Sequence, residues 1–307
     1  MAKVIMPEPS REDIRRGIIY MFASVFVFAT ANAMVKYAEA TYPATEVVFF
    51  RCAFSLIPCL VLIWTHGGFR VLRTRRLPEH IGRGVMQFAS TIAIFIAFHL
   101  MPLADVAAIT FSSPLFVTLL SIPVLGEKVG LHRWGAVLLG FVGVLIMARP
   151  GAGTMTYGAL LALTNAALGA SITIAMRRMT LTEPSTTLVS YQAIVTTVLS
   201  ILALPLGWVT PDLMGLVILI AIGICSGVGQ FLWTQAFRFA PAAVCAPFNY
   251  TSIVWAMGFG FLIWGDIPTP MLVTGALVVA SSGLYILYRE TIRHASQQPN
   301  LAAARGH

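Results

Sequence analysis

The sequence predicts an all-α integral membrane protein with ten transmembrane helices, arranged as two five-helix inverted repeats. Three observations lead to this prediction. Of the 307 residues, 58% are hydrophobic and only 10% are charged, whereas soluble domains are about 25% charged. Apolar runs of the roughly 20 residues needed to cross a bilayer recur along the whole chain. Motifs of the first half also return in the second half at a nearly constant offset.

The apolar runs define ten predicted spans. These are helices, because backbone that faces lipid must satisfy its hydrogen bonds within its own segment. The first span follows Arg11, Arg15 and Arg16 and contains Ala-x-Ala spacing, which resembles a cleavable signal. We interpret it as a retained helix, because it extends through Ala38 and has a counterpart later in the chain. The spans are 17–38, 46–65, 82–100, 105–125, 132–148, 157–176, 187–206, 213–236, 242–264 and 270–288.

The internal repeat is clearest between residues 98–127 and 237–266. Each stretch begins with Phe, continues with Pro four residues later, and ends in a Gly-acid pair, Gly126-Glu127 or Gly265-Asp266. Five spans per half is an odd number, so the second copy enters the membrane from the opposite side. Inverted repeats are typical of secondary transporters, whose ligand site lies near the midplane where the halves meet. Gene duplication in a scaffold or an enzyme is the alternative.

The distribution of basic residues predicts the orientation. All of the 20 Lys and Arg residues except Lys36, Arg51 and Arg149 fall on the same side as the N-terminus, which is therefore cytoplasmic, as is the C-terminus. The net charge of +8 lies in short loops and does not indicate nucleic-acid binding. The chain divides into a cytoplasmic segment 1–16, a first repeat 17–150, a second repeat 157–290, and a cytoplasmic tail 291–307.

Charged and catalytic groups are expected to be absent from the membrane interior. The 12 acidic residues lie in tails, in loops or near span ends, and we expect no carboxylate, Lys or Arg at mid-membrane. A buried acid would mark a proton or cation relay, so carboxylate-driven antiport of cationic drugs is disfavoured. No metalloprotease, serine-hydrolase or P-loop spacing occurs. The sequence therefore predicts no enzyme, no cofactor and no metal site.

Neutral polar and aromatic side chains at helical spacing form the predicted substrate site. Gln87, Thr91 and Phe95 recur every four residues and share one helix face. Amides near the midplane suit a neutral or zwitterionic ligand, and aromatic walls suit an apolar side chain. Hydrogen bonding between helices is the alternative role for any one polar residue. The predicted set is Phe28, Asn32, Gln87, Thr91, Phe95, Asn165, Gln230, Trp233, Asn249 and Tyr250.

Three further residues are candidates for gating. His99 is the only histidine inside a span, where it acts either as a satisfied interfacial residue or as a gate. Pro114 and Pro247 interrupt predicted helices and are hinge candidates, with simple kinks as the alternative. Gly223 and Gly227 form a G-x-x-x-G motif, which predicts close helix packing.

These features resemble the EamA domain of the drug/metabolite transporter superfamily over about residues 16–290. The resemblance lies in the run P-L-A-D-V-A-A-I-T-F-S-S-P-L-F from Pro102 to Phe116 and in the pairs L-G-E at 125–127 and W-G-D at 264–266. Among the branches, the chain is most similar to bacterial amino-acid exporters of the YddG type. The resemblance implies a basket of ten helices around a central cavity, working by alternating access in the inner membrane. Small multidrug relatives use a first-helix glutamate, whereas this first span offers Asn32.

The hypothesis from sequence is an exporter of neutral, mainly aromatic or large apolar amino acids and related metabolites. With no buried acid, gradient-driven uniport is the simplest coupling. The expected partners are the small-molecule substrate and the lipid bilayer, and ten helices can enclose a cavity as a monomer. The alternatives are another metabolite or drug as the solute, a lipid flippase, and a scaffold without transport activity.

Overall fold

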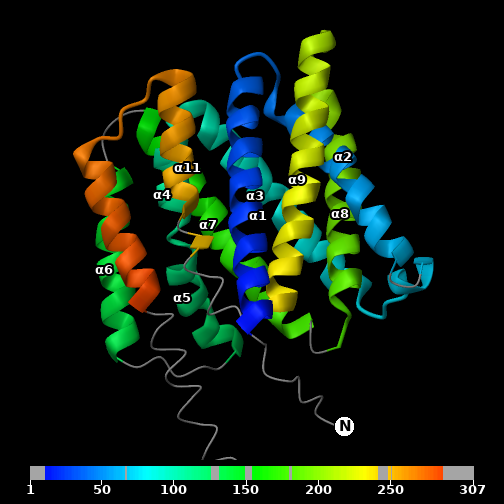
Figure 1. Cartoon of the computed structure of the whole chain (residues 1–307), viewed down its shortest axis with the longest axis horizontal. Coiled ribbons are helices and arrows are strands. Elements are labelled where there is room, and N and C mark those ends of the chain that lie inside the picture. Colours follow the sequence, from blue (N-terminus) through cyan, green and yellow to red (C-terminus); the bar gives the residue numbers. More distant parts are fainter. Residues whose placement is uncertain are drawn as a thin grey trace, which may run out of the picture.

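The computed structural model describes residues 11–65, 68–125, 131–148, 154–179, 182–240, 248–249 and 251–285, and these residues are almost entirely helical (Figure 1). The helices of the first repeat are α1 (Arg11–Ala38), α2 (Ala44–Thr65), α3 (Leu77–Leu100), α4 (Leu103–Thr110), α5 (Ser113–Leu125) and α6 (Leu131–Ala148), with the short η1 (Gly68–Leu72) between α2 and α3. Those of the second repeat are α7 (Thr154–Met179), α8 (Ser185–Ala203), η2 (Leu204–Leu206), α9 (Leu213–Phe239), α11 (Thr251–Phe259), η3 (Gly260–Trp264) and a last helix, Pro270–Tyr285.

The observed helices confirm the predicted ten-span fold, with one difference. Seven helical segments are long and apolar enough to cross a membrane, and the shorter apolar helices Trp134–Met147, Thr251–Trp264 and Pro270–Tyr285 account for the remaining spans. The span predicted at 105–125 is interrupted at Phe111 and Ser112, between α4 and α5. Pro114 lies in the first turn of α5, where its missing N–H costs no hydrogen bond. A new helix therefore starts just before Pro114.

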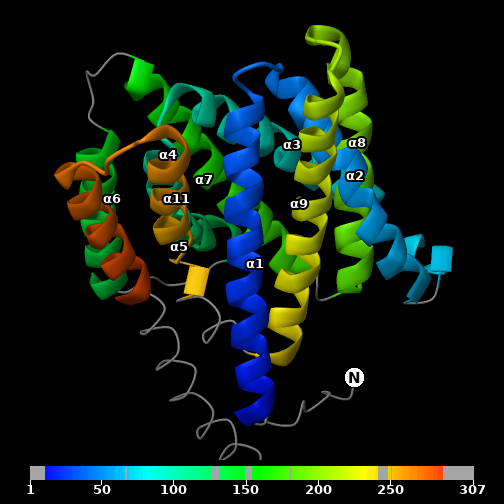
Figure 2. The ribbon, with the colours of Figure 1, turned by 45° about the horizontal axis from the view of Figure 1, so that its top comes forward.

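The two repeats exchange their first helices. α1 of the first repeat packs along α9 of the second, and α7 of the second packs in the same way along α3 of the first. α2 and α8, the second helices of the two repeats, pack against each other. α1 and α9 lie side by side in both views (Figures 1 and 2). This reciprocal pattern is expected of two inverted repeats related by a two-fold axis.

Glycines at equivalent positions of the two repeats make this exchange possible. A Cβ added to Gly17, in the second turn of α1, would overlap Ala240, just after α9. A Cβ added to the equivalent Gly158 in α7 would lie 2.5 Å from the Met101 side chain, just after α3. Small residues at helix crossings allow the close approach on which packing in membranes depends. A glycine contact at equivalent positions therefore allows close packing of both exchanged helices.

A second equivalent pair joins the third helices to the neighbouring second helices. A Cβ on Gly84 of α3 would overlap Val195 of α8, and a Cβ on Gly223 of α9 would overlap Phe54 of α2. Gly227, one turn after Gly223, meets Pro58 of α2 in the same way. The G-x-x-x-G motif of α9 is thus confirmed as a packing surface, directed at α2.

These contacts predict the effect of adding a single methyl group. Gly84→Ala places a Cβ against the branched Val195 side chain, which has no flexible end to move aside, and we expect a loss of about 1–3 kcal/mol. Gly82→Ala on the same helix meets no atom within 4 Å and is expected to be neutral or slightly stabilising. Melting temperatures of the two purified variants in one detergent measure the difference. Equal melting temperatures would contradict the packing described for α3 and α8.

Candidate functional site

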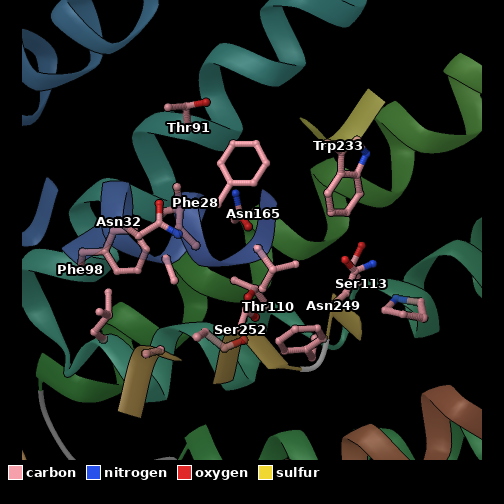
Figure 3. Close-up of a pocket in the computed structure, with 18 of the residues that line it drawn as sticks. Phe28, Asn32, Thr91, Phe98, Thr110, Ser113, Asn165, Trp233, Asn249 and Ser252 are labelled. Atoms are coloured by element: carbon pink, nitrogen blue, oxygen red, sulfur yellow. Dashed lines mark hydrogen bonds between the residues drawn. The ribbon is translucent and has the colours of Figure 1, made fainter. Parts of the chain in front are cut away.

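A central cavity of about 620 Å³ lies between the two repeats. Its wall comes from α1, α3, α4, α5, α7, α9 and α11, with one side chain from α2. This volume is in the range of small-molecule binding sites. Figure 3 shows labelled residues from both repeats converging on this space. The cavity is therefore located where sequence symmetry places a ligand site, at the junction of the repeats.

The structure brings together seven of the ten predicted substrate residues. Phe95 is fully buried in the core, and Gln230 lies on an exposed face of α9, so neither lines the cavity. Tyr250 lies outside the described residues. The seven that line the cavity are Phe28, Asn32, Gln87, Thr91, Asn165, Trp233 and Asn249.

The predicted gating residues are also separated by the structure. Pro114 lines the cavity at the start of α5. His99 is exposed on the outer surface of α3 and does not reach the cavity. Pro247 lies outside the described residues. Of the two that the structure describes, Pro114 is the one placed where a change of helix direction would alter the cavity wall.

Phe28 and Trp233 form an aromatic wall across the α1–α9 interface. Their ring centroids are 6.3 Å apart with an interplanar angle of 70°, an edge-to-face geometry that is favourable for aromatic pairs. Gly229 lets the Phe28 ring lie against α9, because a Cβ there would be 3.0 Å from the ring. Ser24 on α1 donates to the Gly229 carbonyl at 2.8 Å. The two aromatic rings, one from each repeat, are thereby held in place.

Amide groups supply the polar part of the wall. The Asn165 side-chain nitrogen donates to Ser90 Oγ at 2.8 Å and to the Ser90 carbonyl at 3.0 Å, which ties α7 to α3. The side-chain oxygen of Asn165, Oδ1, is then the atom that can accept a hydrogen bond from a ligand. Asn249 Oδ1 is buried and has no hydrogen-bond partner in the described part of the chain. The Asn165 amide therefore offers an acceptor to the cavity, whereas Asn249 lines the wall with its oxygen buried.

A chain of hydrogen bonds orients Gln87. Arg83 Nη1 donates to Gln192 Oε1 at 2.7 Å, and Gln192 Nε2 donates to Gln87 Oε1 at 3.1 Å. Gln87 Nε2 in turn lies 3.4 Å from the hydroxyl of Thr91. The role of Gln192 on α8 was not predicted, because an isolated amide in an apolar run gives no sign of its partner on another helix. This polar chain links the buried Arg83 to the cavity wall.

Arg51 corrects the expectation that no Lys or Arg lies inside the membrane region. The sequence placed Arg51 on the outer side, but α2 starts at Ala44 and Arg51 lies about two turns inside the helix. Its guanidinium carbon is 5.2 Å from the centroid of the Phe95 ring. Arg51 lines the central cavity. The predicted span 46–65 already contained Arg51 near its outer end, but span bounds alone could not show that the residue lines the cavity.

Lys36, near the C-terminal end of α1, connects the two repeats at that end of the molecule. Lys36 Nζ lies 3.5 Å from Asp266 Oδ2, donates to the Met101 carbonyl at 3.2 Å, and sits 4.9 Å from the Trp264 ring centroid. Gly265, with φ 70°, ends η3 in a left-handed conformation that favours glycine. The W-G-D motif therefore caps this segment and positions the acid that pairs with Lys36.

The same end carries a second group of contacts between the α1–α2 and α8–α9 connections. Tyr42 donates to Asp212 Oδ1 at 3.0 Å, and Glu46 Oε2 accepts from the Val209 backbone N–H at 2.9 Å. Thr45 donates to the Gly207 carbonyl at 3.2 Å. These bonds join one repeat to the other at a distance from the cavity.

Glu39, between α1 and α2, gives the protein a predicted pH dependence. Burial raises the pKa of Glu39 from its ordinary value of 4.5 to about 9, and its carboxylate oxygens have no partner among the described residues. The folded state therefore holds a proton that the unfolded state releases, so stability falls as pH rises from about 4.5 to about 9, by at most about 1.4 kcal/mol per pH unit.

We expect Glu39→Gln to raise the melting temperature above about pH 7 and to flatten the decline of the melting temperature between about pH 5 and about pH 9. The neutral amide carries no ionisation cost at that site. Glu79→Gln, at a surface-exposed position paired with Arg76, serves as the matched control. A Glu39→Gln profile parallel to that of the unmodified protein would contradict the assignment.

We expect the loss of stability on replacing Arg83 to be much larger than the loss on replacing Arg76, which lies at the start of the same helix. Arg83 is 1% exposed, and its two terminal nitrogens donate to Gln192 and to the Leu188 carbonyl. Arg83→Ala leaves these buried acceptors unpaired, at an expected cost of about 1–3 kcal/mol. Arg76→Ala removes only an exposed ion pair with Glu79, which contributes less than about 1 kcal/mol. Thermal unfolding of both variants measures the contrast, and equal losses would refute it.

The chain matches the profile of the EamA-like transporter family twice, over residues 15–149 and 156–288. These two matches cover both five-helix repeats. A solved structure, described only as the crystal structure of a protein, has the same fold with a TM-score of 0.63. It is 18% identical in sequence and covers 88% of this chain and 96% of its own.

Several curated transporters are similar over most of their length. A pseudopaline exporter of Pseudomonas aeruginosa, CntI, is 30% identical over 271 residues, covering 87% of this chain and 94% of the relative. An S-adenosylmethionine uptake transporter of Rickettsia bellii is 30% identical over 274 residues, covering 89% and 94%. A riboflavin transporter of Vibrio cholerae is 28% identical over 295 residues, covering 94% and 97%.

Proposed function

The chain belongs to the EamA-like transporter family, and from that premise we propose that it exports neutral, mainly aromatic or large apolar amino acids and related metabolites. The central cavity carries this proposal. It combines an edge-to-face aromatic pair, Phe28 and Trp233, with amides from both repeats. An aromatic wall suits the side chain of such a solute, and the amides suit its polar head group.

The same arrangement supports a mechanism of alternating access. The two repeats would rock around the cavity, with the Lys36–Asp266 contact as the gate at one end. The basic loops favour a cytoplasmic N-terminus, and in that orientation this gate would face the outside. With that end closed, the cavity would load from the cytoplasm during export. The protein would work as a monomer in the bacterial inner membrane.

A different small metabolite is the second candidate for the solute. The relatives described above are named for three different compounds, pseudopaline, S-adenosylmethionine and riboflavin. One common fold thus accompanies several named solutes, and fold alone does not select among them. A panel that contains amino acids and larger aromatic metabolites covers both candidates.

Energy coupling is proposed to be gradient-driven uniport. Among the described residues that line the cavity there is no Asp, Glu or His to carry a proton. An imposed proton gradient should therefore leave the flux of a neutral amino acid nearly unchanged in proteoliposomes. Flux driven by the proton gradient alone would overturn this part of the proposal.

Trp233→Ala tests the site itself. We expect the flux of phenylalanine at low concentration to fall about threefold to tenfold, because an aromatic contact is worth about 0.5–1.5 kcal/mol. Phe231→Ala is the matched control, since Phe231 lies on the same helix, is 38% exposed and does not line the cavity. Counterflow into proteoliposomes at equal protein content measures both. Equal flux in the two variants would remove Trp233 from the site, and no flux of any panel member would refute transport of these solutes.

A further inference from the structure

Arg51 is the one charged residue among the described residues that line the central cavity. The rest of that lining is apolar or carries neutral amide and hydroxyl groups. The described part of the chain shows no ion pair or hydrogen bond for the Arg51 side chain, whose guanidinium carbon lies 5.2 Å from the centroid of the Phe95 ring. The cavity thus has a positive charge without a counter-charge in its described wall.

Such an arrangement requires an explanation, because a charge in the membrane interior is costly and such residues are usually paired. Arg83 shows how this protein compensates a structural arginine. It is 1% exposed and bonded to Gln192 and the Leu188 carbonyl. Arg51 has no comparable partners and is only partly buried, with its exposure facing the cavity it lines. Its unused donors are therefore available to a ligand.

The position of Arg51 separates it from the aromatic wall. At 1.5 Å per residue, Arg51 lies about 10 Å from the start of α2, and Asn32 lies about 9 Å from the end of α1. Both are therefore at a similar depth near the gated end. Phe28 lies one turn farther from that end on α1. A solute with an anionic group at Arg51 would direct its apolar part toward Phe28 and Trp233.

We propose that Arg51 binds a carboxylate of the transported solute, and that this requirement defines the substrate class of the cavity. The guanidinium fork matches a carboxylate with two parallel hydrogen bonds. A single negative charge also neutralises the single positive charge of the described wall, whereas a phosphate dianion would leave an excess negative charge. Phe95 holds the guanidinium from the side opposite to such a ligand. The inference rests on the proposal that this cavity is the transport site.

The test compares phenylacetate with phenylacetamide, which have the same shape and differ in charge. Binding to the purified full-length protein is measured by the shift in melting temperature over a concentration series at constant ionic strength. We expect phenylacetate to bind about tenfold more tightly than phenylacetamide, because hydrogen bonds to charged groups are the strong ones. Equal affinities of the unmodified protein for the two compounds, or no binding of either, would overturn the proposal. Tighter binding of phenyl phosphate than of phenylacetate would overturn the assignment to a carboxylate.

Variants locate the effect at Arg51. Arg51→Gln should bind phenylacetate and phenylacetamide equally, and Arg51→Lys should retain only part of the preference, because an ammonium cannot form the two-pronged contact. Arg70→Gln makes the same change at an exposed residue of η1, outside the cavity, and should keep the full preference. A preference that survives in folded Arg51→Gln would refute the inference.

Flux measurements separate the two proposals. Selective binding of phenylacetate that depends on Arg51, together with no flux of any tested amino acid or metabolite, would refute the transported-solute proposal and leave the carboxylate site in place. Flux of both phenylalanine and phenylalaninamide at equal rates in the unmodified protein would have the opposite meaning. It would support transport and reject a carboxylate requirement.

Discussion

The exchange of first helices between the repeats is the contact on which the rest of the structure depends. Because α1 packs on α9 and α7 packs on α3, neither repeat completes its own bundle, and the cavity lies where the repeats meet. Without a hydrophobic driving force between helices in lipid, such contacts depend on close packing. The equivalent positions Gly17 and Gly158 provide it. Transport by rocking of two halves would have to move these same glycine-lined surfaces.

The fold was predictable from sequence because the length and apolar composition of each span can be read directly from its residues. The repeat is likewise visible in residue identities. The Gly-acid pair shows what such a motif contributes. Gly265 ends its helix through a positive φ, and Asp266 follows at the position that reaches Lys36. The interruption at Phe111 and Ser112 was less visible, since Pro114 can occupy either the first turn of a new helix or a kink within a long one.

The candidate site was predictable only in part, because helical spacing tells which residues share a face but not which face meets the cavity. Phe95 shares the Gln87 and Thr91 face in projection, yet it is fully buried beneath Arg51. Gln230 and Trp233 lie three residues apart on α9, and only Trp233 faces inward. The partnership of Gln87 with Gln192 joins two helices whose relative rotation no single-chain pattern contains.

The buried Arg83 and the partly buried Arg51 contrast a structural role with the proposed ligand-binding role. A guanidinium carries five donors, and in the membrane interior these need protein groups, a ligand or the water of a cavity as acceptors. Arg83 donates to protein acceptors and, through Gln192, orients Gln87. Arg51 instead packs against the Phe95 ring, and its donors face the cavity. α1 then connects this charge to the gate, because Asn32 lines the cavity one turn before Lys36 contacts Asp266. A ligand that binds at the level of Asn32 and Arg51 would contact the helix that carries the proposed gate, and its binding would then be coupled to opening at that end.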